Sequence, residues 1–386
     1  MRTRWNGADP STGVLNLESG GCLAVGASRT DQRKCVLVTG GSGFIGANLC
    51  VALAARHPEW ELVAVDNLKR RGSELNLPRL REAGVTFVHG DVRQPSDLAE
   101  LSGVDAIVEC SAEPSTLAGI ASSPDYPLHT NLSGAYHCLE LARRESAQLI
   151  FLSTSRVYPV AALASVLYDE ESSRFVLSDG QVLPGVSVDG ISELFPLTGA
   201  RTLYGATKLA AELLIEEYAA AFGLRFVVDR CGVVAGPWQM GKVDQGVFTY
   251  WMAAHALGRE LQYLGFNGSG KQVRDVLHVA DLADLIDDQL CRPDDWAGVT
   301  VNVGGGAERS LSLRETTDLC REISGRAVTV SGSAGGRPGD LPIYVSDCRR
   351  LAGHTSWRPK RSSLEVLSDI HEWLTEYRAD LKTVFA

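Results

Sequence analysis

A glycine-rich turn between a short apolar run and a helical pattern constrains this chain more than any other feature of its sequence. The segment VLVTGGSGFIGANL places Gly40, Gly43 and Gly46 after a strand-like run, with Phe44 and Ile45 where the helical pattern begins. Glycines at this spacing allow a tight turn, the close approach of a pyrophosphate and close packing of helix on strand. Free NH groups at the helix N-terminus then attract the phosphates. The segment predicts a dinucleotide-binding βα unit built from these five residues.

An acidic residue follows at the distance expected for a ribose-binding carboxylate. Asp66 ends the next apolar run, ELVAVD, 20 residues beyond Gly46, and Asn67 comes directly after it. A carboxylate accepts hydrogen bonds from ribose hydroxyls but repels the 2′-phosphate of NADP. We interpret the basic run 69–71 as the solvated start of a helix rather than a phosphate clamp. The predicted cofactor is therefore NAD.

Short apolar runs alternate with longer amphipathic segments over the first part of the chain. The strand-like runs are CVLVT, ELVAVD, VTFVHG, AIVEC, LIFLS and RFVVD. Between several of them lie helical patterns such as FIGANLCVALAARH and NLSGAYHCLELARR. Continuous apolar strands separated by helices are typical of a parallel sheet covered on both faces. We expect an α/β fold with a doubly wound parallel sheet of the Rossmann type.

Changes in composition divide the chain into three parts. Residues 1–33 are rich in glycine, serine and polar groups, and we expect a flexible N-terminal extension there. Residues 34–235 form the NAD-binding Rossmann domain in this interpretation. From residue 236 the chain is richer in glycine, proline and tryptophan, with shorter elements. Residues 236–386 are therefore expected to form a smaller substrate-binding lobe, whose late elements could return to the sheet.

An insertion at residues 159–202 interrupts the alternation. Within it, RFVLSDGQVL has two apolar arms around Asp179 and Gly180, which is a two-residue hairpin signal. So long a connection is uncommon unless it forms a lid or a binding element. A surface hairpin without a function is an equally good interpretation of this segment.

The composition excludes several classes of partner. A net charge of −10 argues against a nucleic-acid partner, which needs a basic footprint. No apolar run approaches the ~18 residues of a membrane span, so no membrane partner is expected. The apolar stretch CLAVGA in the extension is too short for a signal peptide, and the expected location is cytoplasmic. No CxxC pair or Cys/His cluster suggests a metal site.

A tyrosine and a lysine stand four residues apart at the start of a second strong helical pattern. They are Tyr204 and Lys208 in TLYGATKLAAELLIEEYAAAFG, which we expect to end at Gly223. A phenol has a reference pKa of about 10, and a nearby ammonium together with the positive ring of an oxidised cofactor favours the phenolate. The spacing alone also suits two surface residues. The pair indicates an active site because it occurs together with the dinucleotide motif and with the hydroxyls at residues 153–155 in STSRVY.

Together these motifs resemble the extended short-chain dehydrogenase/reductases that act on nucleotide sugars. The resemblance runs from about Cys35 to the C-terminus and rests on TGGSGFIG, VDNL, HGDVR, STSRVY, YGATK, GPWQ, GKQVRDVLHVADL and GRPGD. It implies that Tyr204 is the proton-transferring base and that Lys208 holds the ribose and lowers the pKa of the tyrosine. It further implies that Thr154, rather than either neighbouring serine, polarises the reacting sugar oxygen.

The same resemblance assigns further cofactor and substrate contacts. Asp91 and Val92 would flank the adenine, and Ala112 and Asn131 would lie along the cofactor. Arg274 of QVRD and Arg337 of RPGD match the diphosphate-binding arginines, whose guanidinium groups bind phosphate in bidentate fashion. The residues expected to face the nucleotide sugar are Gln239, Asp244 and Gln245. The family also implies a homodimer or homotetramer, formed through helices that begin near Asn131 and Thr202.

The residues after Thr154 discriminate among reactions in this family. Dehydratases carry an Asp-Glu pair there and decarboxylases carry Ser-Glu, whereas this chain has Ser155 and Arg156. Epimerisation through a transient ketone, with NAD regenerated in each turnover, is therefore favoured. DNLKRRGSELNL, WQMGKVDQG and GKQVRDVLH look most like the members that invert C2 of a CDP-sugar, the CDP-paratose to CDP-tyvelose type.

Three alternatives remain open. The chain could be a C4 epimerase or a 4-ketoreductase for another nucleotide sugar, or a non-catalytic NAD sensor or scaffold. Two departures leave the sugar and the inverted carbon undecided. Glu109 stands where many members have histidine, and Val233 stands where many epimerases have asparagine.

Overall fold

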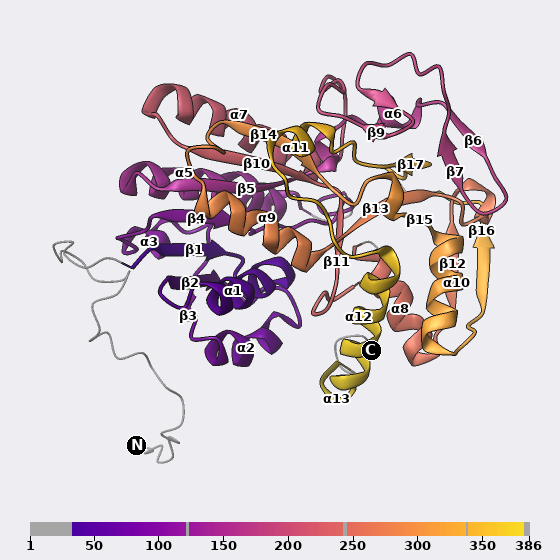
Figure 1. Ribbon diagram of the computed structural model, residues 1–386, viewed down its shortest axis with the longest axis horizontal. Helices are drawn as coiled ribbons and strands as arrows, with labels where there is room; N and C mark the ends of the chain where they lie inside the picture. Colours follow the sequence, from indigo (N-terminus) through magenta and orange to yellow (C-terminus); the bar gives the residue numbers. More distant parts are fainter. Residues whose placement is uncertain (1–32, 121–122, 242–244, 337–338, 382–386) are drawn as a thin grey trace, which may run out of the picture.

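Seven strands form one parallel sheet at the centre of the molecule (Figure 1). The computed structural model describes residues 33–381 except 121–122, 242–244 and 337–338. In spatial order the strands are β3 (Thr86–His89), β2 (Glu61–Asp66), β1 (Cys35–Thr39), β4 (Ala106–Glu109), β5 (Gln148–Thr154), β10 (Phe226–Cys231) and β14 (Val299–Val303). Every neighbouring pair is parallel. The predicted doubly wound sheet is confirmed.

Helices cover both faces of this sheet, which explains why its strands are apolar along their whole length. In β1, Val36 and Val38 pack into one apolar cluster, whereas Cys35 and Leu37 pack into the other. The first cluster lies under α1 (Phe44–Arg56), α2 (Leu77–Glu82), α9 (Val279–Cys291) and α11 (Arg349–His354). The second lies under α3 (Pro95–Ala99), α5 (Gly134–Glu145) and α7 (Leu203–Phe222). Both faces are therefore buried.

The strand order places a crevice above the carboxyl ends of the strands. The chain builds outward from β1 to β3, then returns to the other side of β1 with β4 and continues to β14. Open α/β sheets bind ligands at such a reversal, just outside the carboxyl ends of the strands. The glycine-rich turn follows β1, and Thr154 is the last residue of β5. Both predicted motifs therefore lie at the same edge of the sheet.

A smaller lobe follows β10 and lies to the right of the sheet in Figure 1. Its strands are β11 (Val233–Ala235), β12 (Leu261–Leu264), β13 (Val273–His278), β15 (Ser310–Ser312), β16 (Val330–Ser333) and β17 (Ile343–Tyr344). Its helices are α8 (Val247–Leu257), α10 (Leu313–Ser324), α12 (Ser363–Glu376) and α13 (Arg378–Leu381), and they share an apolar cluster of their own. Between these elements the chain returns to the large sheet through α9 and β14. Within the described residues no helix is both long and apolar enough to cross a bilayer.

The insertion after β5 folds differently from the prediction. It contains α6 (Val160–Ala164), β6 (Tyr168–Glu170), β7 (Phe175–Leu177), β8 (Val186–Ser187) and β9 (Gly190–Ile191). The predicted hairpin around Asp179 and Gly180 is wrong, because β7 pairs with β6 rather than with the residues that follow it. Phe175 is buried and its ring packs at a tilt against Tyr168, and its NH donates to Lys271 O in the lobe. The side chain of Gln181 bonds the NH and carbonyl of Leu167, so the second apolar arm does not form a strand.

Candidate active site

A cavity of about 710 Å³ opens between the carboxyl edge of the sheet and the lobe. It begins at the glycine-rich turn, passes Thr154, Tyr204 and Lys208, and ends beside Arg274. Most of the residues predicted for cofactor and substrate line it. These are Gly40, Gly43, Phe44, Ile45, Gly46, Asp66, Asn67, Val92, Ala112, Thr154, Tyr204, Lys208, Gln239, Gln245 and Arg274. One continuous cavity therefore joins the two ends of the predicted site.

The glycine-rich turn is packed too tightly for side chains. A Cβ on Gly46 would lie 2.3 Å from the carbonyl oxygen of Gly40, and a Cβ on Gly43 would lie 3.0 Å from it. Gly40 itself has φ +62°, a conformation that favours glycine. The turn therefore brings bare backbone and the first NH groups of α1 to the cavity wall. This arrangement suits a pyrophosphate.

Asp66 lies in the cavity wall at the end of β2. Its two carboxylate oxygens accept hydrogen bonds from the NH groups of Ser42 at 3.1 Å and Leu68 at 2.7 Å. Burial raises the pKa of Asp66 above its ordinary value, although these NH groups lower it. Arg70, from the nearby basic run, donates to Met240 O in the lobe at 3.1 Å. The carboxylate is thus held rigidly where a ribose hydroxyl can donate to it, and the residues present fit NAD.

Two of the predicted cofactor contacts do not reach the cavity. Asp91 accepts a hydrogen bond from Asn67 at 3.0 Å and pairs with Arg93, which holds the pKa of Asp91 at about 2. Asn131 is buried and donates to Glu113 O at 3.1 Å and to the Thr207 hydroxyl at 3.1 Å. Both residues therefore orient segments of the cavity wall rather than line it.

Thr154 and Tyr204 meet because α7 docks closely against the turn after β5. Thr202 caps the helix, accepting a hydrogen bond from the NH of Gly205 at 3.2 Å. A Cβ on Gly205 would lie only 2.0 Å from the carbonyl oxygen of Arg156. Glycine at this position therefore lets the helix approach the turn, which brings the Thr154 hydroxyl close enough to the Tyr204 phenol for hydrogen bonding to lower its pKa. The predicted helix end at Gly223 is confirmed, with φ +69°.

Electrostatic effects on Tyr204 oppose one another. Burial raises the pKa of its phenol above the ordinary value, whereas the charge of Lys208 and the hydrogen bond from Thr154 lower it. The thiol of Cys231 and the carboxyl of Glu109 raise it further. Without a further positive charge in the cavity, the phenol therefore keeps its proton at neutral pH.

A buried ion pair holds the ammonium of Lys208. Its Nζ lies 3.0 Å from Oε2 of Glu109, and each side chain is only 1% exposed. The ammonium also lies 4.2 Å from the ring centroid of Phe151 in β5. Burial favours the neutral amine, but Glu109 and then Tyr204 outweigh that effect, so the pKa of Lys208 lies above its ordinary value. The sequence marked Glu109 as unusual but did not show that it contacts this lysine.

The three hydroxyls of the STSRVY motif have different environments. Ser153 donates a hydrogen bond to Glu212, which in turn pairs with Arg230 at 2.7 Å. All three residues line the cavity, but the Ser153 hydroxyl is engaged by Glu212. Of the three, Thr154 is the hydroxyl whose hydrogen bonding lowers the pKa of Tyr204.

Two guanidinium groups line the far end of the cavity. Arg274 pairs with Asp340 at 3.3 Å and donates to Leu341 O at 2.8 Å. Burial, and after it the charge of Arg156, lower the pKa of Arg274 to about 10. Arg156 donates to Gly339 O at 3.1 Å. Two like charges at a buried site favour an anion between them. From the sequence, Arg156 had served only as evidence against dehydration and decarboxylation.

The other residues predicted to bind the substrate differ in whether the structure describes them and in whether their side chains are free to bind a ligand. Arg337 and Asp244 lie outside the described residues. Gln239 lines the cavity, yet its amide is engaged within the protein, donating to Val234 O at 3.0 Å and accepting from the Thr249 hydroxyl at 2.6 Å. Among the described residues, the buried Oε1 of Gln245 has no hydrogen-bond partner, which leaves it available to a ligand.

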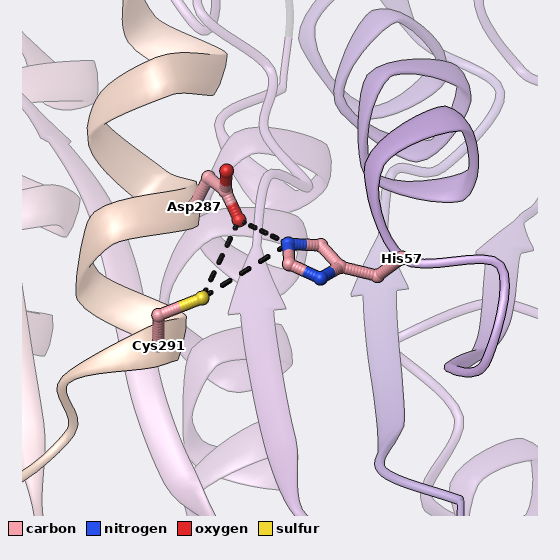
Figure 2. Close-up of side chains that lie close together, drawn as sticks. All are labelled: His57, Asp287 and Cys291. Carbon is pink, nitrogen blue, oxygen red and sulfur yellow. Dashed lines mark hydrogen bonds and ion pairs between the residues drawn. The ribbon is translucent and has the colours of Figure 1, made fainter.

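A second polar cluster lies far from the cavity. Figure 2 shows His57, after α1, pointing toward Asp287 and Cys291 of α9, at the ends of helices that run away from the carboxyl edge. His57 Nε2 lies 2.6 Å from Asp287 Oδ1 and 3.9 Å from Cys291 Sγ. The imidazole also stacks on Trp60 at 3.8 Å, and Arg56 pairs with Asp287 at 3.2 Å. These contacts tie α1 to α9 and account for the cluster without any part in the active site.

The fold and the cavity define a nucleotide-binding α/β enzyme. The NAD dependent epimerase/dehydratase family matches residues 36–304, more than half of the chain. The chain belongs to this family, and NAD is its cofactor.

Relatives within the family catalyse more than one reaction. CDP-paratose 2-epimerase of Salmonella typhi is 30% identical over 349 residues, covering 88% of this chain and 98% of that protein. dTDP-glucose 4,6-dehydratase of Mycolicibacterium smegmatis is also 30% identical over 349 residues, covering 89% and 93%. The structure of Thermus thermophilus UDP-glucose 4-epimerase with NAD is 26% identical, with a TM-score of 0.70 and coverage of 88% and 99%. The predicted family is confirmed, and these relatives divide between epimerases and a dehydratase.

Proposed function

We propose that this protein epimerises a nucleotide-diphosphate sugar by transient oxidation to a ketone and return of hydride to the opposite face. The observation that carries the proposal is the meeting of Thr154, Tyr204 and Lys208 in one cavity that joins the glycine-rich turn to Arg274. NAD, when bound, supplies the acceptor and then the donor of the hydride. The chain itself must bind the sugar, hold its oxygen and move one proton.

Each of the three side chains has one task in this proposal. The phenolate of Tyr204 takes the proton of the sugar hydroxyl as the carbon loses hydride, and returns that proton when hydride comes back. The hydroxyl of Thr154 holds the same sugar oxygen. Lys208 supplies positive charge beside Tyr204 and, with its remaining NH groups, can donate to ribose hydroxyls. No atom is gained or lost over a turnover, as an isomerisation requires.

The substrate's diphosphate would lie at the end of the cavity where Arg156 and Arg274 converge. Charge-assisted contacts of guanidinium groups with phosphate are short and strong. An anion there would also relieve the repulsion that lowers the pKa of Arg274. This explains how an acidic chain can capture an anionic substrate. Arg337 remains a further candidate for the same task.

We infer C2 inversion of a CDP-sugar, the CDP-paratose to CDP-tyvelose type, as the reaction. The support is the likeness to the Salmonella enzyme over nearly its whole length. Ser155 and Arg156 argue against dehydration, since neither supplies the acid that elimination of water needs. C4 epimerisation of another nucleotide sugar is the second candidate, supported by the likeness to the Thermus enzyme.

A screen of CDP-, UDP-, GDP- and dTDP-sugars, with products identified by NMR, tests the proposal. We expect one epimer pair, and in D₂O the inverted carbon should retain protium, because hydride returns without exchange. Deuterium at that carbon, or a dehydrated product, contradicts the mechanism. Tyr204→Phe should lose turnover while retaining NAD, which separates the enzyme from an NAD sensor. If the wild type converts none of these sugars, the sensor is favoured.

We also propose that the chain self-associates through α5 and α7. Large apolar side chains are exposed on these helices, with Tyr136 44%, Leu213 57% and Phe222 59% accessible. Exposed apolar groups on neighbouring helices favour burial against another surface. Light scattering at micromolar concentration should give at least a dimer, and Leu213→Lys should shift it toward monomer.

A further inference from the structure

The Glu109–Lys208 pair occupies an unusual place for two opposite charges. Glu109 is the last residue of β4, and Lys208 reaches it from the second turn of α7. The two groups are 3.0 Å apart and almost completely excluded from solvent. The second carboxylate oxygen of Glu109, Oε1, is also buried and has no hydrogen-bond partner within the described part of the chain. A carboxylate is costly in such a place, and its partner Lys208 accounts for its retention.

The other groups near Lys208 and Tyr204 cannot take over this role. The thiols of Cys110 and Cys231 lie in range of the lysine, and burial raises the pKa of each well above its ordinary value, so both are neutral at physiological pH. Thr154 contributes a neutral hydroxyl from β5. Arg156 lies in range of Tyr204 and adds a second positive charge. Burial raises the pKa of the Glu109 carboxyl, and the charge and hydrogen bond of Lys208, with the NH of Ser111, oppose that effect. Glu109 is therefore the acidic group that pairs with Lys208 at the reacting end of the cavity.

We propose that Glu109 is a positioning residue that fixes the Lys208 ammonium and cancels most of its charge, so that Tyr204 loses its proton only alongside the positive charge of the oxidised cofactor. The inference rests on the proposed function, in which Tyr204 both takes and returns a proton. A tyrosine that is a weak base without this charge keeps the proton after hydride has left the sugar. That proton is then available for the ketone oxygen when hydride returns.

Charge removal with little change of shape tests this proposal. Glu109→Gln keeps an oxygen that accepts from Lys208 but removes the negative charge. Tyrosinate absorbance, followed against pH in the NAD-free protein, should show the Tyr204 midpoint about one pH unit or more below that of the wild type. With NAD⁺ bound, the Tyr204 midpoint of the wild type should fall toward that of the variant, so that the difference between the two midpoints becomes smaller. The acid limb of the kcat/KM profile should shift to lower pH in the variant.

Two further variants test whether the change in tyrosinate absorbance comes from Tyr204 and depends on the charge of Glu109. Adding Tyr204→Phe to Glu109→Gln must abolish the low-pH tyrosinate step. Glu113→Gln removes a carboxylate from the same cavity wall without touching Lys208, and should leave the midpoint where it is. If Glu109→Gln does not fold, as judged by circular dichroism, Glu109→His offers a second neutral partner for the ammonium and carries the same expectation.

An unchanged or higher Tyr204 midpoint in the folded variant overturns the proposal, because it means that the negative charge of Glu109 does not raise the pKa of Tyr204. The titration needs no substrate. A lowered midpoint in a protein that converts no nucleotide sugar would therefore refute the proposed function but support the role of Glu109. An unchanged midpoint in an active epimerase would support the proposed function but refute the role of Glu109.

Discussion

Substitution of Gly205 by alanine tests whether the docking of α7 on the turn after β5 builds the active site. The added Cβ would lie 2.0 Å from the carbonyl oxygen of Arg156. A carbon and an oxygen in close contact stand about 3.3 Å apart, so α7 and the turn must separate by about 1.3 Å. Both partners are backbone, so neither can yield by a rotamer change. Tyr204 precedes the substituted residue and moves with it.

The expected result is a large loss of turnover with a moderate loss of stability. Misplacement of a catalytic group by about 1 Å costs on the order of 10²-fold in rate. Overpacking of this kind costs about 1–3 kcal/mol of the free energy of unfolding. Turnover would be measured by NMR on the sugar nucleotide found in the screen, and unfolding by denaturant titration. NAD retention should change much less than turnover, since the glycine-rich turn is untouched.

Gly223→Ala, at the other end of the same helix, is the matched control. Gly223 has φ +69° and no atom within 4 Å of an added Cβ, so alanine there strains only the backbone. We expect a similar loss of stability, about 1–2 kcal/mol, with normal turnover. A Gly205→Ala enzyme that turns over within a few-fold of the wild type would refute the argument. Equal losses of turnover in both variants would also refute it.

Three further predictions follow from buried charges. Arg274→Ala should weaken binding of a nucleoside diphosphate about 10- to 100-fold by calorimetry while NAD affinity is unchanged; equal losses of both would contradict the assignment. Glu212→Gln leaves Arg230 buried without its partner at 2.7 Å and should cost about 3–5 kcal/mol in denaturant unfolding; a loss below about 1 kcal/mol would contradict it. Burial raises the pKa of Asp229 to about 7, despite a hydrogen bond from Gln289. Because its pKa is higher in the folded than in the unfolded state, the Asp229 carboxyl binds more protons in the folded state between these two pKa values. Raising the pH from about 4 to 7 should therefore lower the free energy of unfolding by about 4 kcal/mol, with no further loss above that range. Asp229→Asn should therefore be more stable than wild type at pH 8 but not at pH 4, and a pH-independent difference would contradict this.

The local features of the fold could be predicted because they depend on neighbouring residues. The runs CVLVT and ELVAVD coincide with β1 and β2, since continuous apolar sequence marks a strand buried on both faces. Helix α7 ends before Gly223 as predicted, because glycine adopts the left-handed conformation without strain. The hairpin at Asp179 and Gly180 failed for the opposite reason. Its turn signal was outweighed by the docking of Phe175 on the lobe.

The predicted site residues were gathered into one cavity, with exceptions that follow a pattern. Asn131 and Asp91 lie behind the cavity wall and act through their neighbours. Gln239 lines the cavity but uses its amide to join Val234 to Thr249. A motif gives the order of residues along the chain, and it does not give the direction in which each side chain points.

The sequence by itself determined the parallel sheet, the glycine-rich turn and the helix that carries Tyr204 and Lys208 four residues apart, because apolar periodicity, glycine spacing and helical register are properties of short segments. The choice of Thr154 as their partner rested on the resemblance to the family. Only the tertiary structure decided what surrounds these three residues. Glu109 and Lys208 are 99 residues apart in the chain, yet their charges meet at 3.0 Å where β4 ends beneath α7. Electrostatic energy depends on distance in space and on the exclusion of water. Both are fixed when the strands and helices pack together.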